Sequence, residues 1–339
     1  MQHGPATRVI DVVYTHTIGE PTCIVTSGII YPGGMDILAK RRFLEDNYDW
    51  VRQALMQEPR GHKDMYGVFL TPAETPEADA GTIWMSGKGF MHTCGHGTIG
   101  LSIALVSMGL KPAEGVITTL NFETTAGPVK AEVKVENGKP EWCRYTNVPT
   151  FVVEDGVEFE LPDHGQVTAD VIFCGIFFGI VDWRKSNLKV CPENASRFAA
   201  LGLQVRDILN DRVRVKHPLY PHINEIETIT FYQDPTNPNA RYRSTHVFGD
   251  GQLDRSPGGA ATAAMLAMFE HRNELAIGET LQAEGLLGAG TFTGCLVGET
   301  DVAGHRAVIT TVQGTARVTG SARWVIDPDD EVGRGFIVS

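Results

Sequence analysis

The stretch from His92 to Gly100, HTCGHGTIG, places a cysteine where the backbone turns into a helix. The apolar run Ile99–Val106 predicts a buried helix, and the glycines before it let backbone amides converge on whatever lies at its start. The positive end of a helix favours an anion and the thiolate form of a cysteine. Cys94 could therefore be a base beside a bound carboxylate. The alternative is a buried structural cysteine.

A second stretch repeats this pattern. The residues Asp254–Thr262 again run from a turn into an apolar helical segment, Ala263–Phe269. Aligned by eye, the two stretches pair Cys94 with Gly258, Gly95 with Gly259, His96 with Ala260 and Thr98 with Thr262. We call each helix start, with the turn before it, a half-site. The sequence then predicts one duplicated half-site whose second copy lacks the thiol.

Length and charge exclude several classes of protein. A chain of 339 residues exceeds one ordinary core, so two domains are expected. The apolar content of 42% is typical of globular proteins. A net charge of −12 argues against nucleic acid or an anionic membrane as partner. A small carboxylate substrate would therefore be held by local donors such as helix termini.

The sequence also indicates where in the cell the protein is located and whether its cysteines are reduced. No stretch approaches the roughly 20 apolar residues that span a bilayer, and the N-terminus lacks a signal-peptide pattern. We therefore expect a cytoplasmic protein with reduced thiols. The cysteines form no CxxC pair, and the two histidines flanking Cys94 have no carboxylate or second thiol near them in sequence, so no metal site is expected.

The order of elements predicts an α+β fold. Short β-rich runs, Val9–Tyr14 and Cys23–Val25, precede a charged helical segment at about residues 35–58, and a further strand covers Val68–Leu70. Strands that cluster rather than alternate one for one with helices indicate α+β instead of a doubly wound sheet. The two motif helices are apolar on nearly every face, which is typical of helices enclosed by a sheet.

The predicted domain boundary lies in a polar, turn-rich stretch at residues 154–166, interpreted as a linker. The first domain, residues 1–165 plus 325–339, would carry Cys94. The second, residues 166–324, would begin with the strand Val171–Cys174 and carry Asp254 and Gly258. The C-terminal tail, residues 325–339, is expected to return to the first domain.

Several motifs together resemble the proline racemase family over nearly the whole chain. They are His16–Pro21 (HTIGEP), Glu58–Gly67 (EPRGHKDMYG), Cys94–Gly97 (CGHG), Asp254–Pro257 (DRSP) and Ala316–Gly320 (ARVTG) with Asp327-Pro328 beyond. The family's order of motifs is kept. The resemblance implies a diaminopimelate epimerase-like fold of two pseudo-symmetric domains, each a curved sheet around a central helix.

The same resemblance implies roles for individual residues. The amides of Gly95, His96, Gly259 and Ala260 would hold a substrate carboxylate, Asp254 would pair with the ring ammonium, and Tyr66 and Phe248 would pack near the ring. Several of these residues also have a simpler, structural interpretation. Asp254 could cap the following turn, Tyr66 and Phe248 could be ordinary core, and Gly258 could serve only the turn after Pro257.

The absence of a thiol at the second helix start determines which reaction we expect. Family racemases and epimerases use a cysteine at each helix start, whereas dehydratases keep the first and replace the second, usually with threonine. In trans-3-hydroxy-L-proline the Cα hydrogen and the hydroxyl leave from one face of the ring, so Cys94 alone could suffice as acid/base. The sequence therefore predicts a cofactor-independent dehydratase of trans-3-hydroxy-L-proline that forms pyrroline-2-carboxylate.

Two alternatives stay open. One is a proline racemase or 4-hydroxyproline 2-epimerase in which water or a neighbouring side chain replaces the second thiol. The other is a non-catalytic binder of proline-like acids. The sequence also leaves open whether the protein is a homodimer.

Overall fold

The computed structural model describes residues 7–338. It divides into two compact units. Unit 1 comprises the chain up to Cys143 together with the chain from Thr315 onward, and unit 2 comprises Arg144–Gly314. Each unit combines paired strands with helices, which confirms the predicted α+β class. No helix within residues 7–338 is long and apolar enough to cross a membrane.

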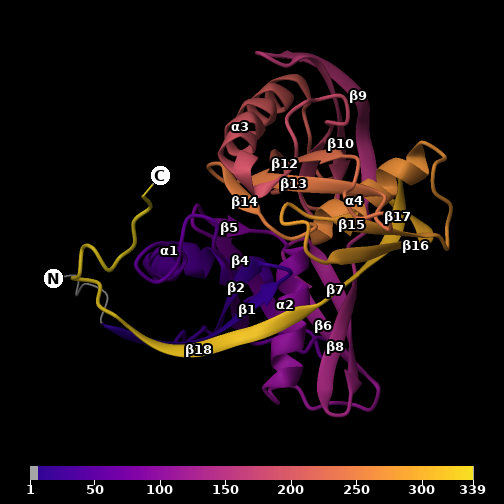
Figure 1. Cartoon of the computed structure of the whole chain (residues 1–339). Helices are drawn as coiled ribbons and strands as arrows, with labels where there is room; N and C mark the ends of the chain where they lie inside the picture. Colours follow the sequence, from indigo (N-terminus) through magenta and orange to yellow (C-terminus); the bar gives the residue numbers. More distant parts are fainter. Residues whose placement is uncertain (1–6, 339) are drawn as a thin grey trace. The chain divides into compact units, whose positions relative to one another are not determined.

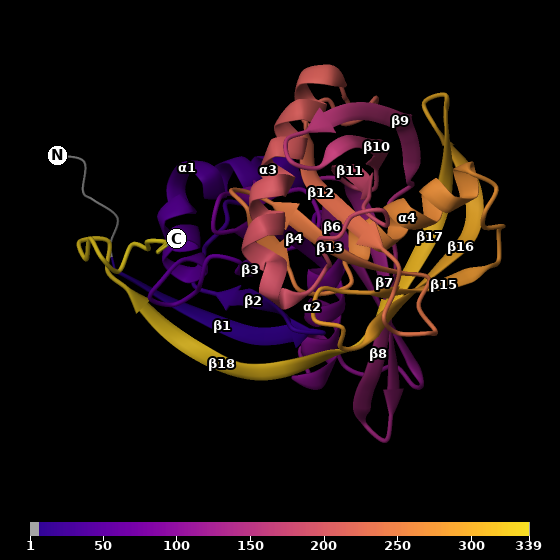
Figure 2. The same ribbon diagram turned by 45° about the horizontal axis from the view of Figure 1, so that its top comes forward.

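Unit 1 contains a long surface helix, a buried helix and a set of strands (Figure 1). Its elements are β1 (Arg8–Thr17), β2 (Glu20–Ser27), α1 (Ile37–Met56), β3 (Tyr66–Thr71), β4 (Ala80–Ser86), β5 (Phe90–Met91), α2 (Gly95–Ser107), β6 (Ile117–Thr124), β7 (Gly127–Glu136), β8 (Lys139–Thr146), which extends past Cys143, and β18 (Ala316–Ile326). Strand β18 pairs antiparallel along the whole of β1 and belongs to the first unit (Figure 2). The sequence interpretation assigned only residues 325–339 of this end of the chain to the first domain.

From its second strand onward, unit 2 repeats the order of strands and α-helices that unit 1 has from its first strand to β8, with one 3-10 turn added. The elements of unit 2 are β9 (Phe151–Leu161), β10 (Gly165–Phe173), β11 (Phe177–Asp182), the 3-10 turn η1 (Pro192–Asn194), α3 (Ala195–Arg212), β12 (Ile226–Gln233), β13 (Tyr242–Phe248), β14 (Gln252–Asp254), α4 (Gly259–His271), β15 (Thr280–Glu284), β16 (Thr291–Val302) and β17 (His305–Gly314). The motif helices α2 and α4 thus fall at corresponding places.

Strand pairing shows that the two units share one topology. In unit 1, β2 pairs parallel with β3, β3 antiparallel with β4, β4 antiparallel with β5 and parallel with β6. In unit 2, β11, β12, β13, β14 and β15 repeat these pairings with the same orientations. The duplication inferred from two short stretches therefore extends over whole units.

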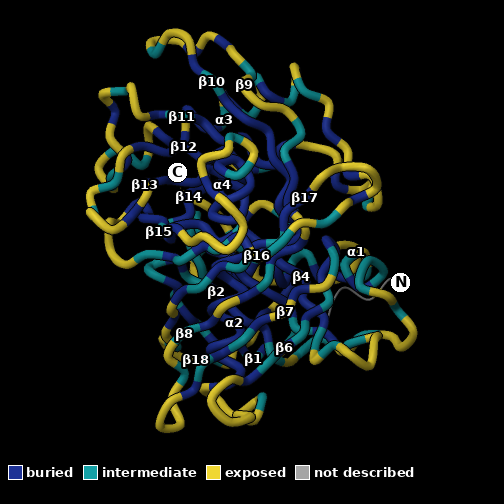
Figure 3. The backbone as a smooth tube through the Cα atoms, turned by 90° about the vertical axis from the view of Figure 1, so that its right-hand side faces the viewer, coloured by how far each residue is buried: buried dark blue, intermediate teal, exposed yellow. Residues whose placement is uncertain are grey.

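The helices α2 and α4 are buried on almost every face (Figure 3). Helix α2 lies against β1, β7 and β18, and α4 lies against β9, β16 and β17. Glycines permit this close packing, because a β-carbon on Gly100 would lie 2.6 Å from the hydroxyl of Thr15 on β1. Helices α2 and α4 are therefore the enclosed apolar helices that the sequence predicts, one in each unit.

The outer helices α1 and α3 are amphipathic instead. In α1, Leu44, Tyr48, Val51 and Leu55 are buried at helical spacing. The side chain of Asp36 caps this helix by accepting from the amide of Ala39 at 2.7 Å. Helix α1 matches the charged segment expected at residues 35–58, whereas the sequence reading had not assigned α3.

The structure differs from the expected linker. Residues 154–161 belong to β9, which forms an antiparallel hairpin with β10 around Gly165. The polar residues that suggested a linker are the consecutive exposed residues 154–156 of β9, the exposed residues 158 and 160, which alternate with buried Phe159 and Leu161, and the turn at residues 162–164. The division between the units accordingly falls at residues 143/144 and 314/315 rather than at 165/166 and 324/325.

The contact between α3 and β13 gives a test of the packing. Alanine normally stabilises a helix relative to glycine by about 0.5–1 kcal/mol. At Gly202, however, a β-carbon would lie 2.4 Å from Val247. We expect Gly202→Ala to lower the free energy of unfolding by about 1–3 kcal/mol, as overpacking does. Urea unfolding of the purified protein measures this.

Gly320→Ala is the matched control, because a β-carbon there meets no atom within 4 Å and Gly320 has no positive φ. Its effect should stay within about 0.5 kcal/mol. If Gly202→Ala is as stable as the wild type, α3 does not approach β13 as closely as described.

Candidate active site

The first half-site is built around Cys94, the N-cap residue of α2. Its backbone is extended, with φ −150° and ψ 112°, and only 5% of the residue is exposed. The carbonyl of Cys94 accepts two hydrogen bonds from Thr98, from the amide at 3.0 Å and from the hydroxyl at 2.7 Å. These bonds fix the backbone that carries the thiol.

The imidazole of His96 is the polar neighbour of this thiol. The Sγ atom of Cys94 lies 3.5 Å from Nε2 and 3.6 Å from Nδ1 of His96. The ring of Tyr66 meets the imidazole edge to face, with centroids 4.5 Å apart. Cys94, His96 and Tyr66, which the sequence singled out separately, thus form one buried cluster.

Glycine in the first turn of α2 makes room for that cluster. A β-carbon on Gly97 would lie 2.4 Å from the indole of Trp84 and 2.9 Å from Sγ of Cys94. The helix is also held from β1, because the hydroxyl of Thr17 donates to the carbonyl of His96 at 2.9 Å. This bond gives a structural reason for the threonine in the HTIGEP motif.

His92 is directed to other partners. Its Nδ1 atom lies 2.9 Å from the hydroxyl of Thr125 and 2.8 Å from a guanidinium nitrogen of Arg41 on α1. Arg41 also donates to the carbonyl of Phe90 at 3.2 Å. These contacts tie the strand before the half-site to α1 and to the β6–β7 turn.

Three other cysteines, Cys23, Cys143 and Cys174, are fully buried outside the half-sites. No disulfide joins the six cysteines, all of which lie in the described residues. Burial raises the pKa of the Cys23 and Cys143 thiols to about 12, and it raises the pKa of Cys174 well above its ordinary value. These three thiols stay protonated near neutral pH and cannot act as bases there.

The second half-site repeats the hydrogen bonds at the helix cap of the first. Gly258 is the N-cap of α4, and its carbonyl accepts from Thr262, from the amide at 2.8 Å and from the hydroxyl at 2.7 Å. Its φ of 77° lies in the left-handed region that favours glycine. The turn interpretation of Gly258 thus has a structural basis, and Gly259 and Ala260 begin the helix as predicted.

Asp254 ends β14 and organises the turn into α4. The residue is 6% exposed, and its Oδ1 atom accepts from the amide of Ser256 at 2.7 Å. The hydroxyl of Ser256 in turn accepts from the amide of Gly258 at 3.1 Å. Asp254 therefore has the turn-capping contact expected from its simpler interpretation, and it holds this contact in a buried half-site.

Phe248 and one unpredicted residue complete this half-site. Phe248 ends β13 and is 2% exposed, and His246 shares its face of the strand because side chains alternate. A β-carbon on Gly258 would lie 2.2 Å from Nε2 of His246. Sequence reasoning missed His246 because it belongs to no motif around α4. The available signal was a histidine two residues before the already selected Phe248.

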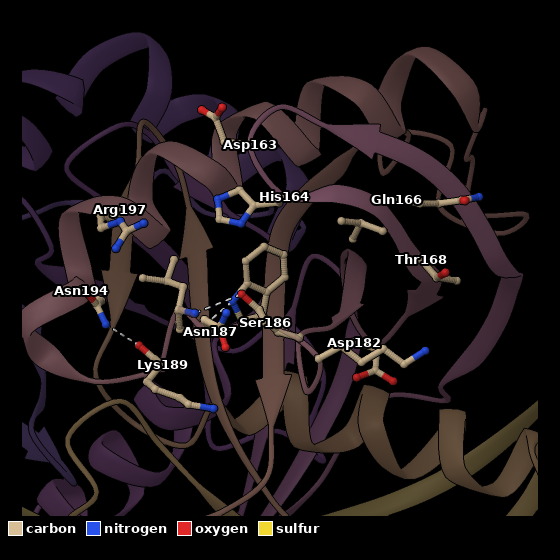
Figure 4. A pocket seen from close by; sticks show the side chains of 14 residues that line it. Asp163, His164, Gln166, Thr168, Asp182, Ser186, Asn187, Lys189, Asn194 and Arg197 are labelled. Atoms are coloured by element: carbon tan, nitrogen blue, oxygen red, sulfur yellow. Dashed lines mark hydrogen bonds between the residues drawn. The ribbon is translucent and has the colours of Figure 1, made fainter.

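Unit 2 also has a surface pocket of about 570 Å³ (Figure 4). The β9–β10 turn, the end of β11 and the start of α3 form it, with His164 and Trp183 in contact at 5.0 Å between ring centroids. The half-site residues of unit 2 are not among the described residues that line it. We therefore place the chemistry at the half-sites and not in this pocket.

Comparison with known proteins supplies the family. The sequence model of the family described as "Proline racemase" matches residues 12–337. The chain is 49% identical to a 4-hydroxyproline 2-epimerase of Cereibacter sphaeroides, over 97% of this chain and 98% of that protein. It is 36% identical to a trans-3-hydroxy-L-proline dehydratase of Azospirillum brasilense, over 98% and 99% of the two chains.

A solved structure agrees with these matches. The crystal structure of a hydroxyproline epimerase from Agrobacterium vitis, with bound trans-4-hydroxy-L-proline, superposes with a TM-score of 0.91 at 28% identity. The match covers 99% of this chain and 96% of that one. The family match spans both half-sites and nearly the full chain, and the chain therefore belongs to the proline racemase family.

Proposed function

We propose that this protein is a cofactor-independent 2-epimerase of 4-hydroxyproline. The observation that carries the proposal is the 49% identity, over almost the full length, to a protein described as a 4-hydroxyproline 2-epimerase. The half-site around Cys94 supports it, because a thiol at the start of a buried helix suits proton abstraction beside a bound carboxylate. This reading replaces dehydration of trans-3-hydroxy-L-proline as the first choice, since the dehydratase relative is less similar.

The proposed epimerisation gives each residue of the two half-sites a role. Epimerisation removes the Cα proton from one face of the ring and returns a proton to the other. Cys94 is the candidate acid/base for one face. The amides at the starts of α2 and α4 would hold the carboxylate, where negative charge grows as the Cα–H bond breaks. Asp254 would pair with the ring ammonium, and Tyr66 and Phe248 would flank the ring.

Dehydration remains a second candidate because of one observation. Gly258 leaves the start of α4 without a thiol, and elimination from trans-3-hydroxy-L-proline needs acid/base catalysis on a single face. Its product, pyrroline-2-carboxylate, is chemically distinct from an epimer.

Three separate incubations distinguish the candidates. The purified protein is mixed with trans-4-hydroxy-L-proline, trans-3-hydroxy-L-proline or L-proline, and products are separated by chiral chromatography. We expect cis-4-hydroxy-D-proline from the first substrate as the main activity. A cyclic imine from trans-3-hydroxy-L-proline without epimerisation would establish the dehydratase instead. Binding of pyrrole-2-carboxylate with no turnover of any substrate would indicate a non-catalytic binder.

Cys94→Ser tests the proposed base. A serine hydroxyl is a far weaker base than a thiolate at neutral pH, so we expect turnover to fall by about 10²-fold or more. Circular dichroism and binding of pyrrole-2-carboxylate should be unchanged. Cys295→Ser removes a partly exposed thiol from β16 as a control and should leave turnover intact. Near wild-type activity of Cys94→Ser would remove Cys94 from the mechanism.

Asp254→Asn tests the proposed ammonium contact. The amide oxygen can still accept from Ser256, which spares the turn, while the negative charge is lost. We expect substrate binding to weaken by about 1.5–3 kcal/mol, the usual loss for a charge-assisted hydrogen bond. Calorimetry with pyrrole-2-carboxylate, which lacks the ammonium, provides the comparison. Equal weakening for that analogue would make Asp254 a purely structural residue.

A further inference from the structure

The imidazole of His246 occupies the space at the start of α4. A β-carbon on Gly258 would lie 2.2 Å from Nε2, 2.6 Å from Cδ2 and 2.7 Å from Cε1 of this ring. Real side chains do not approach so closely, so any larger residue at position 258 would displace the histidine. The glycine and the histidine therefore depend on each other sterically. This contact bears on the alternative in which a neighbouring side chain replaces the second thiol.

The strand register fixes how the ring is held. His246 on β13 is opposite Thr230 on β12 and opposite Asp254 on β14, so the three side chains share one face of the sheet. Its Nδ1 atom lies 2.9 Å from the hydroxyl of Thr230. Its Nε2 atom lies 3.4 Å from the hydroxyl of Ser244 and next to Gly258. Each ring nitrogen thus lies within hydrogen-bonding distance of a hydroxyl, and Nε2 also lies at the start of α4.

The corresponding position in unit 1 differs in chemistry. Trp84 on β4 pairs with Met91, the last residue of β5, just as His246 pairs with the last residue of β14. Trp84 also lies against the first turn of its helix, next to Gly97. Unit 1 thus combines a thiol at the cap with an indole on the strand, whereas unit 2 combines glycine at the cap with an imidazole on the strand. Of these cap and strand positions, the one that carries a thiol or an imidazole is the cap in unit 1 and the strand in unit 2.

We propose that His246 is the acid/base group of the second half-site and takes the place of the absent thiol. The inference rests on the proposed epimerase function. In one direction the Cys94 thiolate takes the Cα proton, the bonding electrons pass into the carboxylate-stabilised carbanion, and the His246 imidazolium returns a proton to the opposite face. Cys94 ends as a thiol and His246 as neutral imidazole. The reverse direction exchanges the two roles, and no other reactant is consumed.

His246→Asn tests the assignment, with His246→Gln as a second variant of comparable polarity. We expect epimerisation to fall by about 10²-fold or more through kcat, because neither amide transfers a proton at neutral pH. Exchange of the Cα hydrogen in heavy water should persist for only one of trans-4-hydroxy-L-proline and cis-4-hydroxy-D-proline, the epimer whose proton Cys94 removes. Cys94→Ser should show the complementary exchange, for the other epimer only.

His217→Asn is the matched control, because His217 is another buried histidine of unit 2, packed on Phe173 and outside the half-site. It should epimerise at the wild-type rate. The proposal is overturned if a His246 variant that binds pyrrole-2-carboxylate epimerises within a few-fold of wild type. It is equally overturned if that variant loses exchange from both epimers together. Absence of epimerisation in the wild type would instead refute the proposed function.

Discussion

The starts of two buried helices are the constraint on which the rest of the structure depends. The first N–H groups of any helix have no partner within it, and α2 and α4 begin inside the protein rather than in solvent. Leaving such donors without an acceptor costs free energy. In each unit a threonine one turn into the helix fixes the cap carbonyl, which sets the direction of the remaining donors. A bound carboxylate is a natural acceptor for them.

The two units show how one backbone supports different side chains at equivalent places. Both have the same strand pairings and the same threonine contacts at the helix cap. They diverge at the cap and at one strand position, where Cys94 and Trp84 in unit 1 correspond to Gly258 and His246 in unit 2. Because the volume beside the cap is limited, a change at one position requires a change at the other. In unit 2 the packing thereby makes the side chain allowed at position 258 depend on the one at position 246, twelve positions earlier in sequence.

Several residues that the sequence singled out separately lie side by side in the structure. Cys94, His96 and Tyr66 form one cluster because motifs far apart in sequence converge on the first turn of α2. The helix starts were predictable because glycine followed by an apolar run is a local signal. The linker was misread, since the polar residues of β9 belong to an exposed strand face and local polarity cannot distinguish that from a loop. His246 was missed because its proximity to Gly258 is created by strand pairing.

Short contiguous patterns in the sequence indicate the duplication, the two apolar helices and the thiol at the first helix start. The family is recognisable for the same reason, because its motifs are also short and contiguous. Only the tertiary structure decided what occupies the second helix start. The absence of a thiol at Gly258 favoured an elimination that needs acid/base catalysis on one face of the ring. The register of β13 between β12 and β14 places an imidazole there instead. Residues that strand pairing brings together have no fixed spacing in sequence. The contact between His246 and the start of α4 therefore could not be predicted from a sequence motif.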